Sequence, residues 1–189
     1  MGVAHHRRKE PERVRRAILE SAAQVASTAG FVGLSLDAVA RAAGITKGGL
    51  IHHYPSKQAL LDALCAGLFS ALDERLDARM VDDPVDWGRF TRAYVALAFS
   101  ECVGPDDADD PWATLGAAAI HIPELQRAWL VWLQGRLERH RLTDSDPDLQ
   151  VARLAADGAW LQVVVSPPDK PPAEFTALRA RLLALASRP

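Results

Sequence analysis

Long apolar runs are absent from this sequence, and cysteine is scarce. No apolar run approaches the roughly 20 residues that a bilayer-spanning helix requires, and residues 1–12 are basic and polar, unlike a signal peptide. Both absences favour a cytoplasmic protein without a membrane span. The only two cysteines, Cys65 and Cys102, lie in apolar helix-like stretches. Their spacing supports neither a disulfide scaffold nor a zinc site; it favours buried, reduced thiols, with redox sensing as the lesser alternative.

Catalytic motifs are missing as well. No nucleophile stands at a workable spacing from a base, no pair of metal ligands follows an i, i+4 pattern, and no phosphate-binding loop occurs. We therefore expect no catalysis, no cofactor and no metal site. A small all-α enzyme is the weaker alternative, which an observation of turnover would revive.

Strand signals are scarce too, because almost every long apolar pattern repeats at three to four residues between Ser, Thr, Asp, Gly or Pro boundaries. The chain is therefore predicted to be all-α, with about nine helices by this periodicity. The expected helices cover residues 11–30, 35–43, 46–54, 56–80, 87–103, 112–121, 123–142, 147–165 and 171–186.

The net charge of −2 hides two parts of opposite sign. Residues 1–57 hold nine Lys or Arg against four Asp or Glu, a net charge of +5, and the remainder holds 13 against 20, a net charge of −7. A basic segment followed by an acidic one fits a protein that binds a polyanion with its basic part. The alternative is that the charged residues only form a solvent-exposed surface. We expect a DNA-binding domain with a basic N-terminal arm in residues 1–57 and a second domain in residues 58–189.

The strongest pattern is a pair of short helices joined by a tight turn between residues 35 and 54. Ser35 and Thr46 can each cap a helix, and Gly44 permits the turn that joins them. This is the spacing of a helix-turn-helix, whose second helix enters the major groove of DNA with its N-terminal residues at the base edges.

The second helix of this pattern carries residues suited to DNA. Lys47 can donate to guanine or phosphate, and Ile51 offers an apolar contact to a thymine methyl. The Gly48-Gly49 pair leaves the backbone bare, and because each glycine costs the helix roughly 1 kcal/mol relative to alanine, something other than helix stability favours them. His52 and His53 add ring donors and acceptors.

A plain helical hairpin is the alternative. In that case Thr46 and Ser56 only cap helices, and one of the two histidines is packed rather than facing DNA. Leu50 and Tyr54 are expected in the core under either interpretation.

Residues 36–57, LDAVARAAGITKGGLIHHYPSK, resemble the helix-turn-helix of the TetR family, and the specific match covers about residues 11–65. The resemblance implies a homodimeric DNA-binding regulator of transcription, usually a repressor, whose grip on operator DNA loosens when a small-molecule effector enters the C-terminal domain. The DNA-facing set that it implies is Ser35, Thr46, Lys47, Gly48, Gly49, Ile51, His52, His53 and Lys57. Because the family commonly has a hydroxyl-bearing aromatic residue at the place of Ile51, we expect one phosphate contact to be missing or to be supplied elsewhere, with His52 as one candidate.

The C-terminal domain is expected to bind the effector between its helices. Aromatic side chains are plentiful there, and three polar residues stand in apolar stretches, where an unpaired charge would be costly. The pocket candidates are Trp87, Phe90, Tyr94, Phe99, Glu101, Trp112, His121, Trp129, Trp132 and Asp157. Core packing is the more common alternative for any one aromatic residue, and an arginine partner such as Arg153 is the alternative for Asp157.

The last two expected helices suit dimerisation. One is apolar nearly all round between residues 160 and 165, and the other shows apolar residues at helical spacing, so both need burial on several faces. The interface candidates are Trp160, Val164, Phe175, Leu178, Leu182 and Leu185. A two-fold dimer predicts an imperfectly palindromic operator. The alternative is a DNA-binding dimer without an effector, with a structural role in the chromosome.

Overall fold

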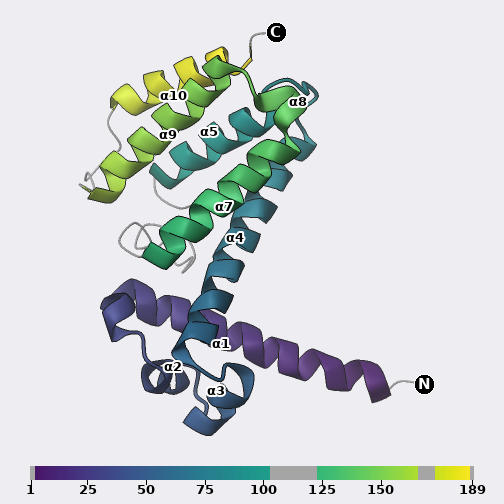
Figure 1. Ribbon diagram of the computed structural model, residues 1–189, viewed down its shortest axis with the longest axis vertical. Helices are drawn as coiled ribbons and strands as arrows, with labels where there is room; N and C mark the ends of the chain where they lie inside the picture. Colours follow the sequence, from purple (N-terminus) through teal and green to yellow (C-terminus); the bar gives the residue numbers. More distant parts are fainter. Residues whose placement is uncertain (1–2, 103–122, 166–172, 188–189) are drawn as a thin grey trace. The chain divides into compact units, whose positions relative to one another are not determined.

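The computed structural model describes the backbone of residues 3–102, 123–165 and 173–187, leaving aside the side chains of residues 3–10, 31, 32, 101, 102, 124, 164, 165 and 173. Over these ranges the chain forms nine helices and no strand (Figure 1). The helices are α1 (Val3–Gly33), α2 (Leu36–Ala42), α3 (Lys47–His53), α4 (Lys57–Val81), α5 (Arg89–Cys102), α7 (Pro123–Arg139), α8 (Arg141–Asp144), α9 (Pro147–Val165) and α10 (Ala173–Leu185). None of these helices combines the length and the hydropathy that crossing a membrane requires.

Three hydroxyl side chains cap α2, α3 and α4 as the sequence predicts. The backbone N–H groups of Ala38, Gly49 and Ala59 donate to the side-chain oxygens of Ser35, Thr46 and Ser56, each over 3.1 Å. Each cap satisfies a backbone donor that the first turn leaves free, an interaction of about 1 kcal/mol.

Other helix ends differ from the expectation. α1 begins at Val3 instead of Pro11, and at the expected stop, Gly30, it kinks (φ 66°, ψ 174°) and continues to Gly33. The expected helix 123–142 ends at Arg139, with α8 as a separate short helix after it, whereas α9 has the predicted bounds. The expected helix 112–121 lies outside the described residues.

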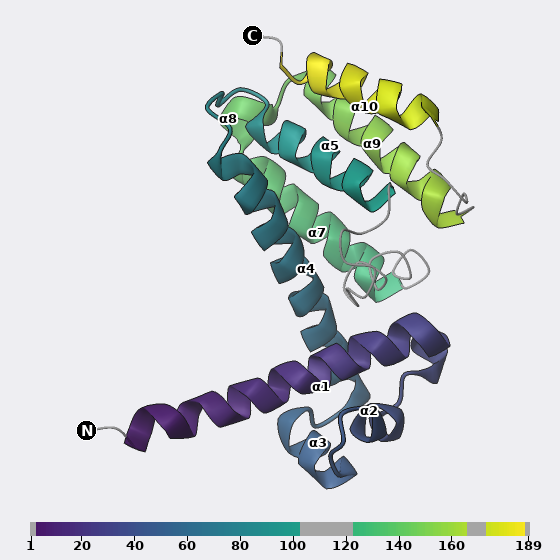
Figure 2. The ribbon, with the colours of Figure 1, turned by 180° about the vertical axis from the view of Figure 1, so that it is seen from behind.

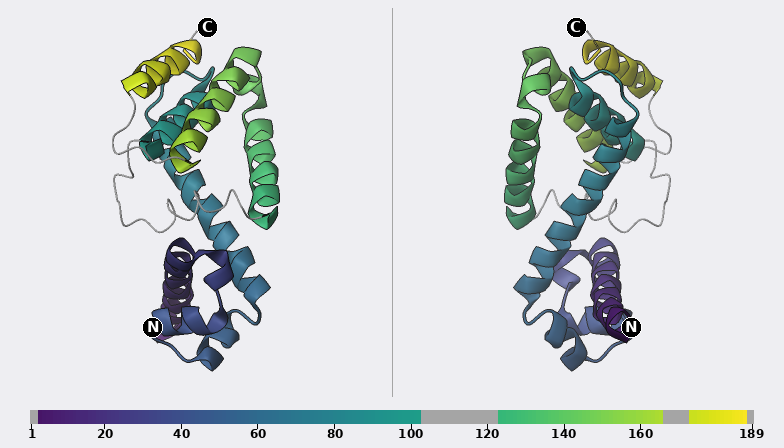
Figure 3. Two further views of the ribbon diagram at one scale, coloured as in Figure 1. Left: turned by 90° about the vertical axis from the view of Figure 1, so that its left-hand side faces the viewer. Right: turned by 90° about the vertical axis from the view of Figure 1, so that its right-hand side faces the viewer.

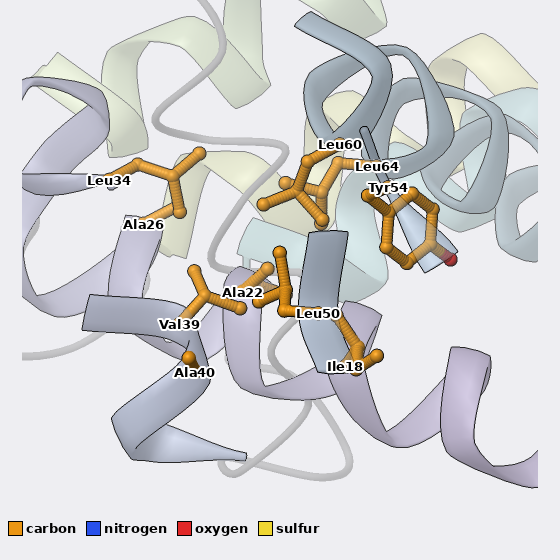
Figure 4. Packing of buried hydrophobic residues seen from close by; sticks show 11 residues of the cluster. Ile18, Ala22, Ala26, Leu34, Val39, Ala40, Leu50, Tyr54, Leu60 and Leu64 are labelled. Carbon is orange, nitrogen blue, oxygen red and sulfur yellow. The ribbon is translucent and has the colours of Figure 1, made fainter. Parts of the chain in front are cut away.

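By their internal contacts, the described residues form two compact units: residues 3–70 with 123–126, and residues 71–102 with 127–165 and 173–187. In the first unit, α2 contacts both α1 and α3 (Figure 3). Side chains from α1, α2, α3 and the first half of α4 point toward one another and form one apolar core (Figure 4). Its buried members include Ile18, Ala22, Ala26, Leu34, Val39, Ala40, Leu50, Tyr54, Leu60 and Leu64.

In the second unit, α5 packs against both α9 and α10 (Figure 2). The core between these three helices contains Val95, Phe99, Ala152, Ala156, Ala159, Phe175 and Leu182. A further core joins the second half of α4 to α5 and α7, and its buried members are Leu76, Phe90, Ala93, Tyr94 and Leu97.

The leucine stripe of α4 serves both units. Leu60 and Leu64 belong to the first core, whereas Leu76 is buried in the α4–α5–α7 core and Leu72 packs against it. The unit boundary falls inside this one helix, between Ser70 and Ala71. One continuous helix therefore contributes side chains to the cores of both units.

Arg92 ties the chain segment before α5 to the end of α10. Its guanidinium pairs with both carboxylate oxygens of Asp83 (2.7 and 2.9 Å) and donates to the carbonyls of Val85, Trp87 and Ala186. All five of its N–H donors are thereby used. Gly88 lies beside this cluster with φ +72°, and a Cβ there would stand 2.5 Å from the carbonyl oxygen of Ala186, so only glycine fits.

Candidate functional site

The two helices of the expected helix-turn-helix are α2 and α3. Gly44 adopts φ +67° at the turn, a conformation that glycine reaches without strain. The N–H of Ile45 then donates to the carbonyl of Ala40 over 3.0 Å, which closes the turn. Leu50 is fully buried and Tyr54 is 2 % exposed, which confirms their assignment to the core.

The residues expected to face DNA lie together on the outside of this motif. Ser35, Thr46, Lys47, Gly48, Gly49, Ile51, His52 and Lys57 are exposed, and His53 is half-buried. Ile51 is 40 % exposed to solvent although it is a large apolar residue. These exposed residues extend from Ser35, before α2, to Lys57 at the start of α4, and Leu50 and Tyr54 between them are buried.

Of the two adjacent glycines of α3, Gly49 lies close to the Thr46 cap, whereas Gly48 has open space around it. A Cβ at Gly48 would meet no atom within 4 Å, and one at Gly49 would meet only the Thr46 hydroxyl oxygen, at 3.2 Å. Neither glycine has a positive φ. Both glycines weaken the helix, and at Gly48 no contact among the described residues requires a bare backbone.

Lys47 is held by an ion pair that sequence reasoning missed. Its Nζ lies 2.9 Å from Oδ2 of Asp37 on α2, and both side chains are more than half exposed (54 % and 62 %). The residue expected to donate to DNA thus has an acidic partner on the neighbouring helix.

Arg15 of α1 supports the end of α3. Its guanidinium lies 4.8 Å from the centre of the Tyr54 ring, and its Nη1 donates to the carbonyl of His53 over 3.4 Å. The Tyr54 hydroxyl donates back to the carbonyl of Arg15. Burial raises the pKa of Tyr54, and the positive charge of Arg15 opposes this shift without reversing it. The phenol therefore stays protonated and can donate its hydrogen bond.

Most of the aromatic pocket candidates pack in the cores of the second unit. Phe90 and Tyr94 are buried together, with ring centres 5.9 Å apart, and Phe99 meets Phe175 edge to face at 6.0 Å. Trp87, Trp129 and Trp132 are half-buried, and the last two have ring centres 5.0 Å apart. Trp112 and His121 lie outside the described residues, as does the side chain of Glu101.

Asp157 is partnered by a tyrosine. The Tyr94 hydroxyl donates to Oδ1 of Asp157 over 2.6 Å. Burial raises the pKa of Asp157, although the Tyr94 hydrogen bond and the Arg153 charge act in the opposite direction. Burial and the Asp157 charge hold the pKa of Tyr94 well above its usual value, so the phenol remains the donor.

A buried polar network joins α5, α8 and α9. Oδ1 of Asp144 accepts from both the backbone N–H and the hydroxyl of Thr91, over 2.8 and 2.7 Å, and Arg153 donates to the Thr91 hydroxyl. All three residues are at most 7 % exposed. Thr91 lies 53 residues from Asp144, so only the folded chain brings them together.

Arg136 forms a second buried polar group between α7 and α4. The side chain is 2 % exposed; Nη2 lies 2.6 Å from Asp77, and Nη1 lies 3.3 Å from Asp73. Asp73 also accepts a hydrogen bond from the indole N–H of Trp132 over 3.0 Å.

His140 stacks on the ring of Phe90, with ring centres 5.0 Å apart.

The residues expected at a dimer interface pack mostly inside the chain. Phe175 and Leu182 are buried in the α5–α9–α10 core, and Trp160, Leu178 and Leu185 pack against it. The side chain of Val164 lies outside the description. Three other apolar side chains of α9 are exposed instead: Val151 (55 %), Leu154 (62 %) and Leu161 (44 %).

Two family models match this chain. Residues 18–64 match the model for bacterial regulatory proteins of the tetR family, and residues 88–187 match the tetracyclin repressor-like C-terminal domain. The first range contains the α2–α3 motif, and the second contains α5, α9 and α10.

Curated relatives and solved structures agree with these matches. The HTH-type transcriptional regulator BetI of Stenotrophomonas maltophilia is 30% identical over 81% of this chain and 82% of its own length, and that of Pseudomonas paraeruginosa is 32% identical over 77% of each. A structure of the multidrug binding protein EbrR complexed with malachite green has a TM-score of 0.71 at 20% identity, covering 92% of this chain and 98% of its own. The structure of a member of the TetR family from Streptomyces coelicolor A3 has a TM-score of 0.66 at 22% identity, and the match covers 93% of this chain and 99% of that one.

The exposed α2–α3 motif, the matches to both units and the similarity to BetI point in one direction: the chain belongs to the TetR family and is a DNA-binding regulator of transcription.

Proposed function

We propose that this protein is a homodimeric repressor that binds a two-fold-symmetric operator and leaves it when a small molecule binds the C-terminal domain. The observation that carries the proposal is the outer surface of α3, where a run of exposed residues, including a glycine with empty space around it, is left without a packing role. In this scheme residues 1–57 bind DNA, residues 58–189 sense and dimerise, and the protein works in the cytoplasm beside its DNA.

The contact set on DNA is Ser35, Thr46, Lys47, Gly48, Gly49, Ile51, His52, His53 and Lys57. Lys47 and His52 donate to base edges or phosphates, and Ile51 contacts a thymine methyl. Gly48 lets the backbone of α3 approach the groove. His53 contributes least, because its side chain is half-buried.

The dimer surface is the exposed stripe of α9. Val151, Leu154, Gly158 and Leu161 are all exposed and follow one another at three- and four-residue steps, so they share one face of the helix. On α10 the exposed residues Ala177, Ala180 and Ala184 have the same spacing. Small residues permit close approach, and an apolar face of this kind needs a partner, which a second copy supplies with two-fold symmetry.

The effector binds in the second unit, close to the half-buried pair Trp129 and Trp132. These rings pack against the core that also contains Tyr94, and the indole N–H of Trp132 donates a hydrogen bond to Asp73 of α4. A ligand that displaces the Trp132 ring breaks this hydrogen bond between α7 and α4. Because α4 is one helix from Lys57 to Val81, a shift of this kind is passed toward the DNA-binding end.

Selection of bound sequences from random duplex DNA tests the function. We expect one enriched site with two-fold symmetry, and release of the protein from this site by at least one small molecule in a screen. An enriched site without symmetry contradicts the dimeric scheme. Binding that no small molecule weakens favours the effector-independent alternative, against which the match of residues 88–187 to the tetracyclin repressor-like domain counts.

A further inference from the structure

One acidic residue lies beside the proposed DNA-binding surface. Asp37 is the single Asp or Glu between Glu20 and Asp62, in a stretch that otherwise carries Arg41, Lys47 and Lys57. It occupies the second position of α2, and its carboxylate lies 2.9 Å from the ammonium of Lys47, the single Lys or Arg of α3. Asp37, the single acid of this stretch, is thus paired with Lys47, the single Lys or Arg of the helix that is expected to enter the major groove.

The backbone around this pair is fixed. The cap bonds of Ser35 and Thr46 hold the first turns of α2 and α3, and the Ile45 to Ala40 hydrogen bond closes the turn between them. The two charged residues therefore stand opposite each other because of the motif's geometry, although they are ten residues apart.

A carboxylate at this place affects the two modes of DNA binding differently. Binding to any sequence depends on lysine and arginine reaching phosphates, and Asp37 both occupies the Lys47 ammonium and repels phosphates. At a matching site Lys47 can keep one hydrogen on Asp37 and direct its other hydrogens to the acceptors of a base edge. The penalty therefore falls mainly on complexes that are held by phosphate contacts alone.

We propose that Asp37 is a specificity-determining residue: it restrains Lys47 and weakens binding to non-operator DNA more than binding to the operator. The inference rests on the proposed DNA-binding role of α3 and adds a residue outside the expected contact set. A purely structural role for Asp37 is the competing explanation, since an acid in the first turn of a helix also stabilises the helix dipole.

The experiment compares Asp37→Asn with Asp62→Asn in the full-length protein. Both variants remove one negative charge from the first unit, but Asp62 is bonded to Gln58 within α4 and not to a cation of α3. Affinity is measured by fluorescence anisotropy over a range of salt concentrations. The two probes are the duplex recovered by the selection and a scrambled duplex of the same composition.

We expect Asp37→Asn to raise affinity for the scrambled duplex about two- to fivefold, the range of exposed ion pairs, and to steepen its salt dependence by about one counterion. Affinity for the recovered duplex changes less, so the specificity ratio falls. In a Lys47→Met background we expect Asp37→Asn to raise affinity for the scrambled duplex less than it does when Lys47 is present, because only the repulsion between Asp37 and phosphates is then relieved. A helix-dipole role predicts the same effect in both backgrounds.

Equal effects of Asp37→Asn and Asp62→Asn, or an equal gain on both duplexes, would overturn the inference. The Lys47→Met background separates a folding defect from a binding effect, because lost helix stability persists there and is visible in thermal melting. If the wild-type protein enriches no sequence in the selection, the proposed function fails instead, so the two failures are distinguishable.

Discussion

Gly48 has no packing reason to be glycine. Replacing it with alanine fills open space, removes conformational freedom from the unfolded chain and suits a helix better. We expect Gly48→Ala to raise the free energy of unfolding by about 0.4–1 kcal/mol and to weaken operator binding tenfold or more, because the added methyl keeps α3 away from the groove. Thermal melting and binding to the selected duplex measure the two effects.

Gly135 of α7 provides the matched control. A Cβ at Gly135 also meets no atom within 4 Å, and the residue lies in the second unit. Gly135→Ala should stabilise the protein by a similar amount and leave operator binding unchanged. A Gly48→Ala variant that binds as tightly as the wild type would remove Gly48 from the interface.

We expect His140 to make the fold sensitive to mild acid. Burial and the neighbouring positive charge of Arg136 lower the pKa of His140 below its ordinary value of 6.5. The charge of Arg139 lowers this pKa further, whereas the carboxylates of Asp144 and Asp77 raise it. A folded-state pKa below the unfolded value means that protonation favours the unfolded chain, so stability is complete above about pH 6.5 and falls as the pH decreases below it.

His140→Phe should reduce this acid sensitivity. A phenyl ring can keep the stacking on Phe90, and Nε2 of His140 has no hydrogen-bond partner to lose. We expect the melting temperature of the variant to fall less than that of the wild type between pH 7 and pH 5.5. Identical pH slopes for the two proteins would show that His140 does not titrate in this range.

At the scale of elements, the helices whose ends depend on local residues could be predicted from the sequence. Ser35, Thr46 and Ser56 cap the helices that they were expected to cap, because a cap bond joins groups only three residues apart. The α2–α3 motif was predicted for the same reason, since Gly44 and the flanking caps determine its turn.

Elements that depend on distant contacts could not be predicted. The break between α7 and α8 accompanies the bonds from Thr91 to Asp144, which lie 53 residues apart, and apolar periodicity carries no information about them. Likewise Arg92 reaches Ala186 across 94 residues. Periodicity also identifies an apolar face without telling what covers it, so Phe175 and Leu182 were expected at a dimer interface although they pack against the chain's own core.

The exposed stripe of α9 leads to a prediction at the same scale. Leu154 is 62 % exposed, so Leu154→Arg leaves the fold intact but places a charge in the centre of the proposed dimer surface. We expect the variant to sediment as a monomer and to lose tight operator binding. Leu130→Arg on α7, where the side chain is 57 % exposed, is the control and should remain dimeric. A dimeric Leu154→Arg variant would place the interface elsewhere.

At the scale of the whole molecule, charge is distributed unevenly along the chain, and one helix contributes to the cores of both units. Residues 1–57 carry a net charge of +5 and the remainder a net charge of −7, so in the proposed scheme the phosphates contacted by the basic part repel the acidic part. α4 supplies Leu60 and Leu64 to one core and Leu76 to the other, so it is the one described helix that belongs to the buried clusters of both units.

The central claim is that two copies of α3 read one operator. The most direct test is the number of chains bound to the selected duplex, measured by native mass spectrometry, with a half-site duplex of equal length beside it. The account predicts two chains on the full site and an affinity for the half-site that is lower by about 100-fold or more, the scale on which a linked second binding event acts. One chain bound equally well to the full site and the half-site would contradict it.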